Sequence, residues 1–246
     1  MADGAPVRLW DLVLDVRPIP EPFDFQALPG ELWVLGGAVD SGRRELIRTI
    51  AGLADPRAGR VELFGRDLAR LRPRARAKLR GQIGVVLEQA GLVPAWSVFE
   101  NLSLLVRYHR LVPAGDIEGY VMDFAESCRL PPSILPRLAG ELLPLESSWV
   151  GLLRALIIKP KLLLVSTYLP QETLVAGYDA RMFFEEVVRP MRMTILVDGG
   201  PQSLKVEPET RLLVMDRGTL LAAGPAHELA DHPSALVRHR ARADRA

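Results

Sequence analysis

The chain contains 246 residues, of which 48% are hydrophobic and 25% are charged. This composition is typical of a globular protein large enough for one α/β domain with an inserted subdomain. The 31 Lys and Arg residues balance 30 Asp and Glu residues, and the formal net charge of +1 does not indicate a nucleic-acid partner. The single cysteine, Cys128, excludes an intrachain disulfide and a cysteine metal cluster. We expect it to be a buried structural thiol in a reducing cytoplasm.

Membrane-spanning and secretory segments are not recognised in the sequence. No apolar run reaches the roughly 18 residues that a membrane helix requires, and the N-terminus lacks the basic, apolar and small-residue series of a signal peptide. A function at a membrane would therefore depend on docking to another subunit.

The first third of the chain alternates short strand-like and turn-like segments. β-Branched and aromatic residues predict strands over residues 7–16 and 31–35, with a proline-rich stretch between them. A helix is predicted over residues 44–53, and a strand over residues 60–64 is followed by a turn at Gly65. These segments predict a small β unit near the N-terminus.

The middle of the chain changes to a helical period. Residues 72–80 form a basic helical run, which we interpret as a solvated helix face because no aromatic residues interleave it as in a nucleic-acid site. A short apolar strand is predicted over residues 82–87. Residues 98–156 then read as helices separated by prolines, which predicts an inserted helical subdomain.

Continuous apolar segments return in the last third. The run KLLLV at residues 161–165 is typical of a strand buried on both faces of a parallel sheet, and residues 193–197 and 211–215 are similar. Strands that alternate with helices predict an α/β fold with a mainly parallel sheet. A short helix is expected after Pro225.

The segment ELWVLGGAVDSGRRELIRTIAGL, residues 31–53, has the layout of a phosphate-binding loop. Such a loop needs GxxxxGK[ST] between a strand and a helix, so that backbone N–H groups, a lysine and a hydroxyl hold phosphates and magnesium. Gly37 and Gly42 keep the spacing, but Arg43 and Arg44 occupy the lysine and hydroxyl positions, and Glu45 follows. Two interpretations stay open: weak nucleotide binding, or a strand, turn and helix without a ligand. The two guanidinium groups at a helix N-terminus also suggest a static anion site, with local ion pairing as the alternative.

Several longer segments resemble those of the nucleotide-binding subunit of an ATP-binding cassette (ABC) transporter. They are ALPGELWVLGG, RTIAGLADPRAGRVELFGRDL, IGVVLEQAGLVPAWSVFENL, LLRALIIKPKLLLV and RLLVMDRGTLLAAGPAHEL, and together they extend over nearly the full length. The resemblance implies a P-loop NTPase-like sheet, an N-terminal antiparallel β subdomain and an inserted helical subdomain. We expect residues 1–246 to form a single domain, with residues 1–97 and 157–246 as core and β subdomain and residues 98–156 as helical subdomain.

The positions that carry the family's chemistry are changed. Where the resemblance implies a magnesium-binding aspartate, a catalytic glutamate and a switch histidine, the chain has Ser166, Thr167 and Gly199. None of these is a carboxylate base or an imidazole. The glutamine-loop position falls on Glu88, with Gln89 next to it, so a shift of one residue would restore an amide ligand. No catalytic residue and no metal ligand set is therefore predicted.

The segment that corresponds to the LSGGQ signature reads LLPLE from Leu142. In the family this segment grips the nucleotide held by the opposite subunit, whereas here both glycines are missing and a proline removes one N–H donor. The residues at the signature position are Leu143, Pro144, Leu145 and Glu146.

The resemblance implies a subunit that docks on a membrane permease at the inner face of the cytoplasmic membrane and pairs with a second cassette, a copy of itself or a different chain. It also implies ATP and magnesium as cofactors, against which the changed positions argue, and we therefore predict a pseudo-ATPase. The segments ENLSL and PSALVRHR also resemble subunits of Mla-type lipid transporters, which implies lipid transport and an MCE-type lipid-binding partner. Two alternatives stay open: a divergent active ATPase that uses Arg43 and a carboxylate such as Glu88 or Asp198, and a soluble regulatory or assembly module.

Two further sets of side chains are candidates for binding. Trp96, Phe99 and Tyr108 could line a groove for the permease, with core packing as the alternative, above all for Phe99. The four histidines lack metal-ligand spacing with carboxylates, so a solvated or packing role is expected for them.

Overall fold

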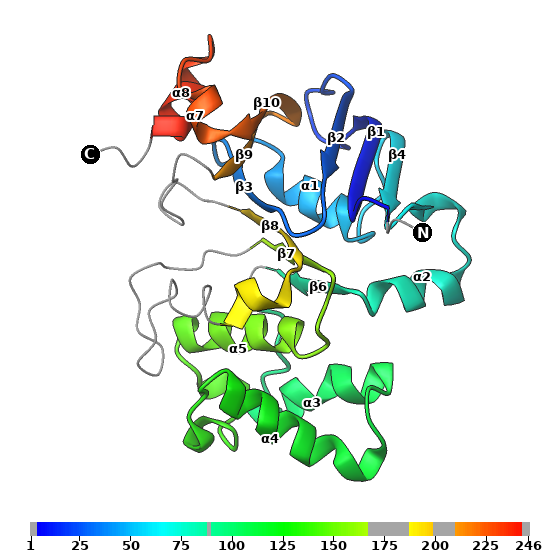
Figure 1. Cartoon of the computed structure of the whole chain (residues 1–246), viewed down its shortest axis with the longest axis vertical. Helices are drawn as coiled ribbons and strands as arrows, with labels where there is room; N and C mark the ends of the chain where they lie inside the picture. The colour runs from blue at the N-terminus through cyan, green and yellow to red at the C-terminus, as the bar shows by residue number, and fades with distance from the viewer. Residues whose placement is uncertain (1–3, 88–89, 167–186, 199–209, 243–246) are drawn as a thin grey trace.

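The computed structural model describes residues 4–87, 90–166, 187–198 and 210–242. In this part of the chain, helices pack on two β-sheets (Figure 1). The larger sheet has the strand order β10-β9-β3-β8-β7-β6, in which the strands from β9 to β6 are parallel and β10 is antiparallel to β9. Its strands are β3 (Leu32–Gly36), β6 (Ile83–Val86), β7 (Leu162–Val165), β8 (Thr194–Asp198), β9 (Arg211–Asp216) and β10 (Thr219–Pro225).

The central strands of the larger sheet are buried on both faces. All four residues of β7 are buried, and β8 is buried up to its last residue, Asp198. Alternate side chains enter two hydrophobic clusters on opposite sides of the sheet, so that Val34 belongs to one cluster and Leu35 to the other. Continuous apolar strands between two layers of helix are the pattern of a parallel sheet. The predicted α/β fold with a mainly parallel sheet is confirmed.

A smaller antiparallel sheet of order β2-β1-β4-β5 is formed by residues near the N-terminus. Helix α1 (Arg43–Ile50) packs between the two sheets, because Leu46, Ile47 and Ile50 share one cluster with the inward side chains of both. The strands are β1 (Val7–Val13), β2 (Phe23–Ala27), β4 (Ala58–Leu63) and β5 (Arg66–Asp67). The predicted antiparallel β subdomain is thus present.

Strand β2 corrects the sequence-based prediction, in which residues 23–27 have no strand. The segment FDFQA, five of the six residues between Pro22 and Pro29, is too short for a clear pattern. Its burial nevertheless alternates strictly, with Phe23 and Phe25 inside. Pairing with β1 therefore provides the order that local sequence did not indicate.

The longest described helices are α3 (Val98–His109), α4 (Ile117–Ser127) and α5 (Pro144–Leu156). α5 packs on the face of the larger sheet opposite to α1, and α3 and α4 lie on the far side of α5 (Figure 1). α3 begins with a capping box, in which Ser97 and Glu100 each accept a hydrogen bond from the other's backbone N–H. No helix in the described ranges has both the length and the apolar character to cross a membrane. The remaining helices of four or more residues are α2 (Pro73–Arg80), α7 (Ala226–Leu229) and α8 (Ala235–Arg242).

Predicted element ends differ from the observed ones by a few residues. The helix predicted to extend to residue 53 ends at Ile50, because Gly52 adopts a left-handed backbone with φ 66°. The strand predicted over residues 7–16 ends at Val13, where an irregular register with β4 closes the pairing. In both cases the residue types that favour the helix or strand continue beyond the last residue whose backbone hydrogen bonds belong to it.

Cys128 follows α4 and is 1% exposed, in agreement with the buried thiol expected from the sequence. Burial raises its pKa to about 11, although the Ser127 hydroxyl, 3.9 Å from Sγ, partly offsets this effect. A thiol with this pKa is almost entirely protonated at neutral pH and is a poor nucleophile.

We expect native Cys128 to react with a disulfide reagent at pH 8 at least about a hundredfold more slowly than an exposed thiol, because about one molecule in a thousand carries the thiolate at that pH. Stopped-flow absorbance of the released thiol anion measures the rate. Met122→Cys in a Cys128→Ser background is the matched control, since Met122 is 41% exposed on the same helix. Equal rates for the two thiols would contradict the buried position.

Candidate functional site

The loop between β3 and α1 keeps the backbone shape of a phosphate-binding loop. Gly37 has φ 147° and Gly42, the N-cap of α1, has φ 91°, both in the region that favours glycine. A Cβ at Gly37 would lie 2.4 Å from the Met215 carbonyl oxygen, and one at Gly42 would lie 2.8 Å from Cα of Gly218. The Gly218 N–H also donates to the Ser41 carbonyl at 2.8 Å. Both glycines are thus required by contacts with β9 and the β9–β10 turn.

Arg43 stands at the lysine position, and its side chain folds back into the loop. The side chain is only 8% exposed. Nε donates to the Ser41 hydroxyl at 3.0 Å, and Nη2 donates to the Ala38 carbonyl at 3.3 Å. Nη1 donates to the carbonyl of Leu35 at 3.4 Å. The sequence predicted this guanidinium as a ligand for phosphate. In the structure its N–H groups are instead bound by the loop itself.

The counter-charge for Arg43 comes from Asp198, the last residue of β8. Nη1 of Arg43 lies 2.6 Å from Oδ1 of Asp198, and the aspartate side chain is 12% exposed. β8 is the direct neighbour of β3 in the sheet, with Leu35 opposite Asp198, so the carboxylate reaches the start of the loop. A charge-assisted hydrogen bond of this length between two shielded groups is strong, and each partner would be costly to leave alone. The guanidinium that was predicted to bind an anion thus contacts a carboxylate of the chain itself.

Arg44 and Glu45 lie in the first turn of α1 and are exposed. Arg43, in contrast, is buried, so the two arginines of the predicted anion site differ in exposure. The negative charge of Glu45 lies close to the N-terminus of the helix, where it interacts favourably with the helix dipole.

Of the expected catalytic positions, only one lies in the described part of the chain. Ser166 follows β7 directly, is 4% exposed, and donates its backbone N–H to the Val86 carbonyl at 2.7 Å. It presents a hydroxyl where the family's pattern requires a carboxylate. Thr167, Gly199, Glu88 and Gln89 lie outside the described residues.

The signature position forms the start of α5, and its N-terminus is closed by an internal carboxylate. Pro144 is the first helical residue, and Glu146 accepts the Leu143 N–H at 2.9 Å. Arg137 donates two hydrogen bonds to the same carboxylate, at 2.9 and 3.2 Å. These bonds, first of all those from Arg137, lower the pKa of Glu146. Leu145 packs against the large core cluster, and Leu143 is 66% exposed.

The two candidate phosphate-contacting elements lie far from each other within the chain, because α1 and α5 cover opposite faces of the sheet (Figure 1). They share one electrostatic feature. At α1 the cation is paired with Asp198, and at α5 the helix N-terminus is capped by Glu146. Each element thus holds an internal carboxylate at a place suited to an anion.

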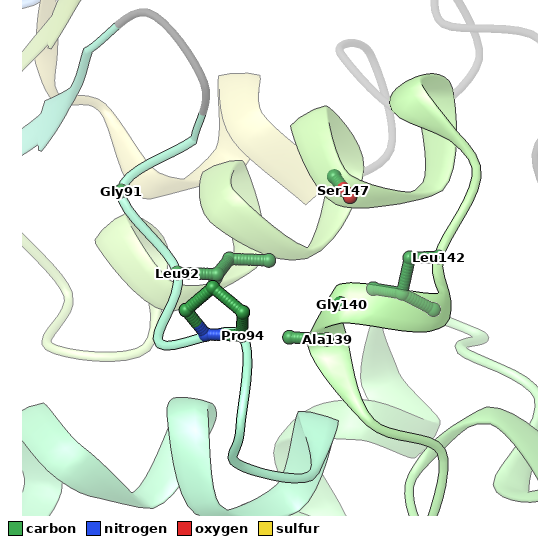
Figure 2. Close-up of a pocket in the computed structure, with 7 residues that line it drawn as sticks. All are labelled: Gly91, Leu92, Pro94, Ala139, Gly140, Leu142 and Ser147. Carbon is green, nitrogen blue, oxygen red and sulfur yellow. The ribbon is translucent and has the colours of Figure 1, made fainter.

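A pocket of about 370 Å³ opens beside the segment that follows the glutamine-loop position (Figure 2). Arg154 of α5 donates to the carbonyls of Ala90 and Gly91 at 3.0 and 2.8 Å and fixes this segment to the helix. Residues 90 and 91 both have positive φ, 57° and 62°. The pocket is lined by Gly91, Leu92, Pro94, Ala139, Gly140, Leu142 and Ser147.

The predicted groove residues do not line this pocket. Trp96 is 39% exposed and Tyr108 is 67% exposed, whereas Phe99 packs against the core cluster. Among the described residues no group of three or more His, Cys, Asp or Glu side chains is placed to hold a metal ion.

Sequence reasoning missed three of the interactions that shape the site. Asp198 was considered as a replacement base, not as the ion-pair partner of Arg43. The bond from Arg137 to Glu146 and the clamp of Arg154 on residues 90–91 were not predicted at all. One of these interactions has a local sequence pattern. Glu146 lies three residues after Leu143, the N-cap of α5, which is the spacing of a capping carboxylate.

We expect Asp198→Ala to lower the free energy of unfolding by about 3 kcal/mol, because it leaves the Arg43 charge buried without its carboxylate. Urea denaturation followed by circular dichroism measures the change. Asp216→Ala, at the end of the neighbouring strand β9, is the matched control and should change stability by less than about 0.5 kcal/mol.

The double variant Arg43→Met/Asp198→Leu should regain most of the loss, since apolar residues of similar volume replace a buried ion pair without a large cost. Equal stability of Asp198→Ala and Asp216→Ala would contradict the assigned role of the pair.

Comparisons with known proteins agree with the geometry. A family model described as "ABC transporter" matches residues 21–165. The sulfate/thiosulfate import ATP-binding protein CysA of Methylococcus capsulatus is 28% identical over 233 residues, which are 90% of this chain and 65% of that protein. The methionine import ATP-binding protein MetN of Cereibacter sphaeroides is 26% identical, over 94% of this chain and 63% of that protein. The chain spans less than two thirds of the length of each of these relatives.

Solved structures share the fold. The dimeric structure of MJ0796, a bacterial ABC transporter cassette, superposes with a TM-score of 0.75 at 16% identity and covers 89% of this chain and 98% of that chain. CbiO1 from Clostridium perfringens, part of the ABC transporter complex cbiONQ, gives a TM-score of 0.69 at 16% identity, covering 96% and 98%. Because the family model matches more than half of the sequence, the chain belongs to the ABC transporter family and has the fold of its ATP-binding cassette.

Proposed function

We propose that this chain is a cassette subunit of an ABC transporter in which ATP hydrolysis is lost. The observation that carries the proposal is the buried ion pair between Arg43 and Asp198. A phosphate-binding loop works by offering an uncompensated cation to phosphate oxygens, and here that cation is already neutralised inside the loop. Binding of a nucleotide phosphate by Arg43 would require that the pair be broken and two shielded charges be exposed.

The described residues do not fit magnesium and ATP as the family would bind them. The position of the magnesium-binding hydroxyl is Arg44, an exposed cation, and the position of the magnesium-binding aspartate is Ser166. Arg44 thus puts a cation where a neutral hydroxyl oxygen would hold the ion, and Ser166 puts a neutral hydroxyl where a charged carboxylate would hold it.

Asp198 is the strongest support for the alternative of a divergent active ATPase, because it is a carboxylate at the mouth of the loop. A carboxylate that accepts a hydrogen bond of 2.6 Å from a guanidinium is stabilised in its charged form, and this weakens it as a general base. The ion pair therefore supports the pseudo-ATPase over this alternative.

As partners we propose a membrane permease and a second cassette, with the chain held peripherally at the inner face of the cytoplasmic membrane. Support comes from the names of relatives, which are import ATP-binding proteins, and from a structural neighbour described as a dimeric cassette. We retain the division into a core and a helical subdomain over residues 98–156 as part of this proposal. Lipid transport with an MCE-type partner rests on ENLSL and PSALVRHR alone, since these relatives are named for sulfate and methionine.

The purified chain should hydrolyse magnesium–ATP no faster than the double variant Arg43→Ala/Glu88→Ala, because loss of a catalytic base alone costs on the order of two to four powers of ten in rate. Release of inorganic phosphate, followed continuously, measures the turnover. Turnover that is clearly above background and is abolished in the double variant would establish the divergent ATPase. Asp216→Ala serves as the control for a nonspecific effect of substitution.

Affinity purification of the tagged chain from its native membranes should recover a permease and a second cassette with intact lysine, aspartate and glutamate positions. Mass spectrometry identifies the recovered chains, and untagged cells provide the background. Recovery of a permease without a second cassette would contradict the proposed pairing. Recovery from the soluble fraction alone would favour the regulatory or assembly module.

A further inference from the structure

The near-zero net charge hides a strongly uneven distribution of charged residues. Three segments, residues 68–87, 101–115 and 147–166, contain no Asp or Glu at all. The same segments carry eleven of the 31 Lys and Arg residues, so the rest of the chain is acidic on balance. They are Arg70, Arg72, Arg74, Arg76, Lys78, Arg80, Arg107, Arg110, Arg154, Lys159 and Lys161.

The fold brings these three segments together. β6 and β7 are parallel neighbours, and the Lys161 N–H donates to the Gln82 carbonyl at 2.9 Å. At the end of α2, a Cβ at Gly81 would lie 3.0 Å from Nδ1 of His109, at the end of α3. The N-terminal ends of β6 and β7 and the C-terminal ends of α2 and α3 therefore share one region of the surface (Figure 1). We call seven of its exposed cations the basic face: Arg72, Arg74, Lys78, Arg80, Arg107, Arg110 and Lys159.

Among the described residues, no carboxylate forms a salt bridge with the basic face, although the charge of Glu100 on α3 interacts with Arg107. The described ion pair nearest in sequence to the basic face joins Asp67 to Arg70, with Oδ2 and Nε 3.2 Å apart. Arg70 itself is not part of the basic face. Arg80 donates to the Gly52 carbonyl at 3.3 Å, and Arg107 contacts the Ser103 hydroxyl at 3.5 Å. Both contacts leave the positive charge uncompensated. The basic face thus presents a concentrated positive potential.

Exposed apolar side chains lie among these cations. Tyr108, between Arg107 and His109 at the end of α3, is 67% exposed, and Leu111 next to Arg110 is 37% exposed. Leu53 is 46% exposed and adjoins Gly52, the residue that Arg80 contacts. The run of basic residues at 72–80 has no aromatic neighbours in sequence, but the fold brings Tyr108 from α3 to the same region. Cations mixed with exposed tyrosine and leucine are typical of surfaces at the interface of a membrane.

We propose that the basic face binds the anionic phospholipid headgroups of a bilayer surface. Clusters of four to eight Lys and Arg residues attract such headgroups, and nearby apolar side chains enter the boundary between headgroups and acyl chains. The basic face contributes no residue to either of the two described pockets. A broad charged face with scattered apolar groups matches a planar partner better. The proposal goes beyond the proposed function, because it requires neither a permease nor a nucleotide.

Co-sedimentation of the full chain with vesicles tests the proposal. Binding is expected to vesicles that contain about one third phosphatidylglycerol and not to vesicles of phosphatidylcholine alone. Because each basic side chain near the surface contributes about a fivefold factor in affinity, Arg74→Glu/Lys78→Glu should weaken binding at least about twenty-fivefold, and the two new negative charges should weaken it further. An increase of salt from about 0.1 M to about 0.5 M should release most of the wild-type protein without any substitution.

Arg17→Glu/Arg217→Glu is the matched control. Both residues are exposed and lie on the β1–β2 and β9–β10 connections, which meet where Gly218 approaches Val16 and Pro20. This variant has the same net charge as the test variant and should bind vesicles like wild type. Equal losses in the two variants, or equal binding to neutral and anionic vesicles, would overturn the proposal. Salt-sensitive binding to duplex DNA without binding to anionic vesicles would also overturn it and would identify nucleic acid as the partner.

Discussion

The ion pair between Arg43 and Asp198 is the interaction on which the site depends. A guanidinium that is 8% exposed is tolerated only with a counter-charge and with acceptors for its N–H groups. The loop supplies the acceptors through Leu35, Ala38 and Ser41, and the neighbouring strand supplies the charge. The loop consequently encloses the guanidinium of Arg43. Through its hydrogen bonds this side chain of α1 connects β3 and β8. Glu146 closes the start of α5 in a similar way, so both elements hold their own anion.

Much of the fold was predictable from the sequence because burial leaves a local pattern. The run KLLLV indicates a strand buried on both faces, and β7 has all four residues buried. The glycine spacing of the loop indicates its backbone shape, and the two glycines do adopt the unusual backbone angles. The partner of Arg43 leaves no such pattern, since Asp198 is 155 positions away in sequence. Only the parallel pairing of β3 and β8 places the carboxylate beside the guanidinium.

The same distinction explains why strand β2 was not predicted and why the surroundings of the basic run at residues 72–80 could not be predicted. Strand β2 has five residues between prolines, and its pairing with β1 rather than its own length makes it a strand. The basic run at residues 72–80 reads as a plain solvated face because sequence neighbours contain no aromatic residue. Tyr108 comes from a different helix, some thirty positions later, and reaches the same surface through the contact of His109 with Gly81. Surface composition is a property of the fold and cannot be read from one segment.

The glycines of the loop show what a family resemblance measures. Gly42 leaves no room for a side chain because the β9–β10 turn lies against it, and Gly37 is limited in the same way by the backbone of Met215. Packing alone would thus select against any replacement, whether or not a phosphate ever enters the loop. A motif search counts these glycines as evidence of phosphate binding. In this chain they are also required where the β3–α1 loop packs against β9 and the β9–β10 turn. The spacing of the glycines is therefore evidence of how these two loops pack, and by itself it does not report hydrolysis.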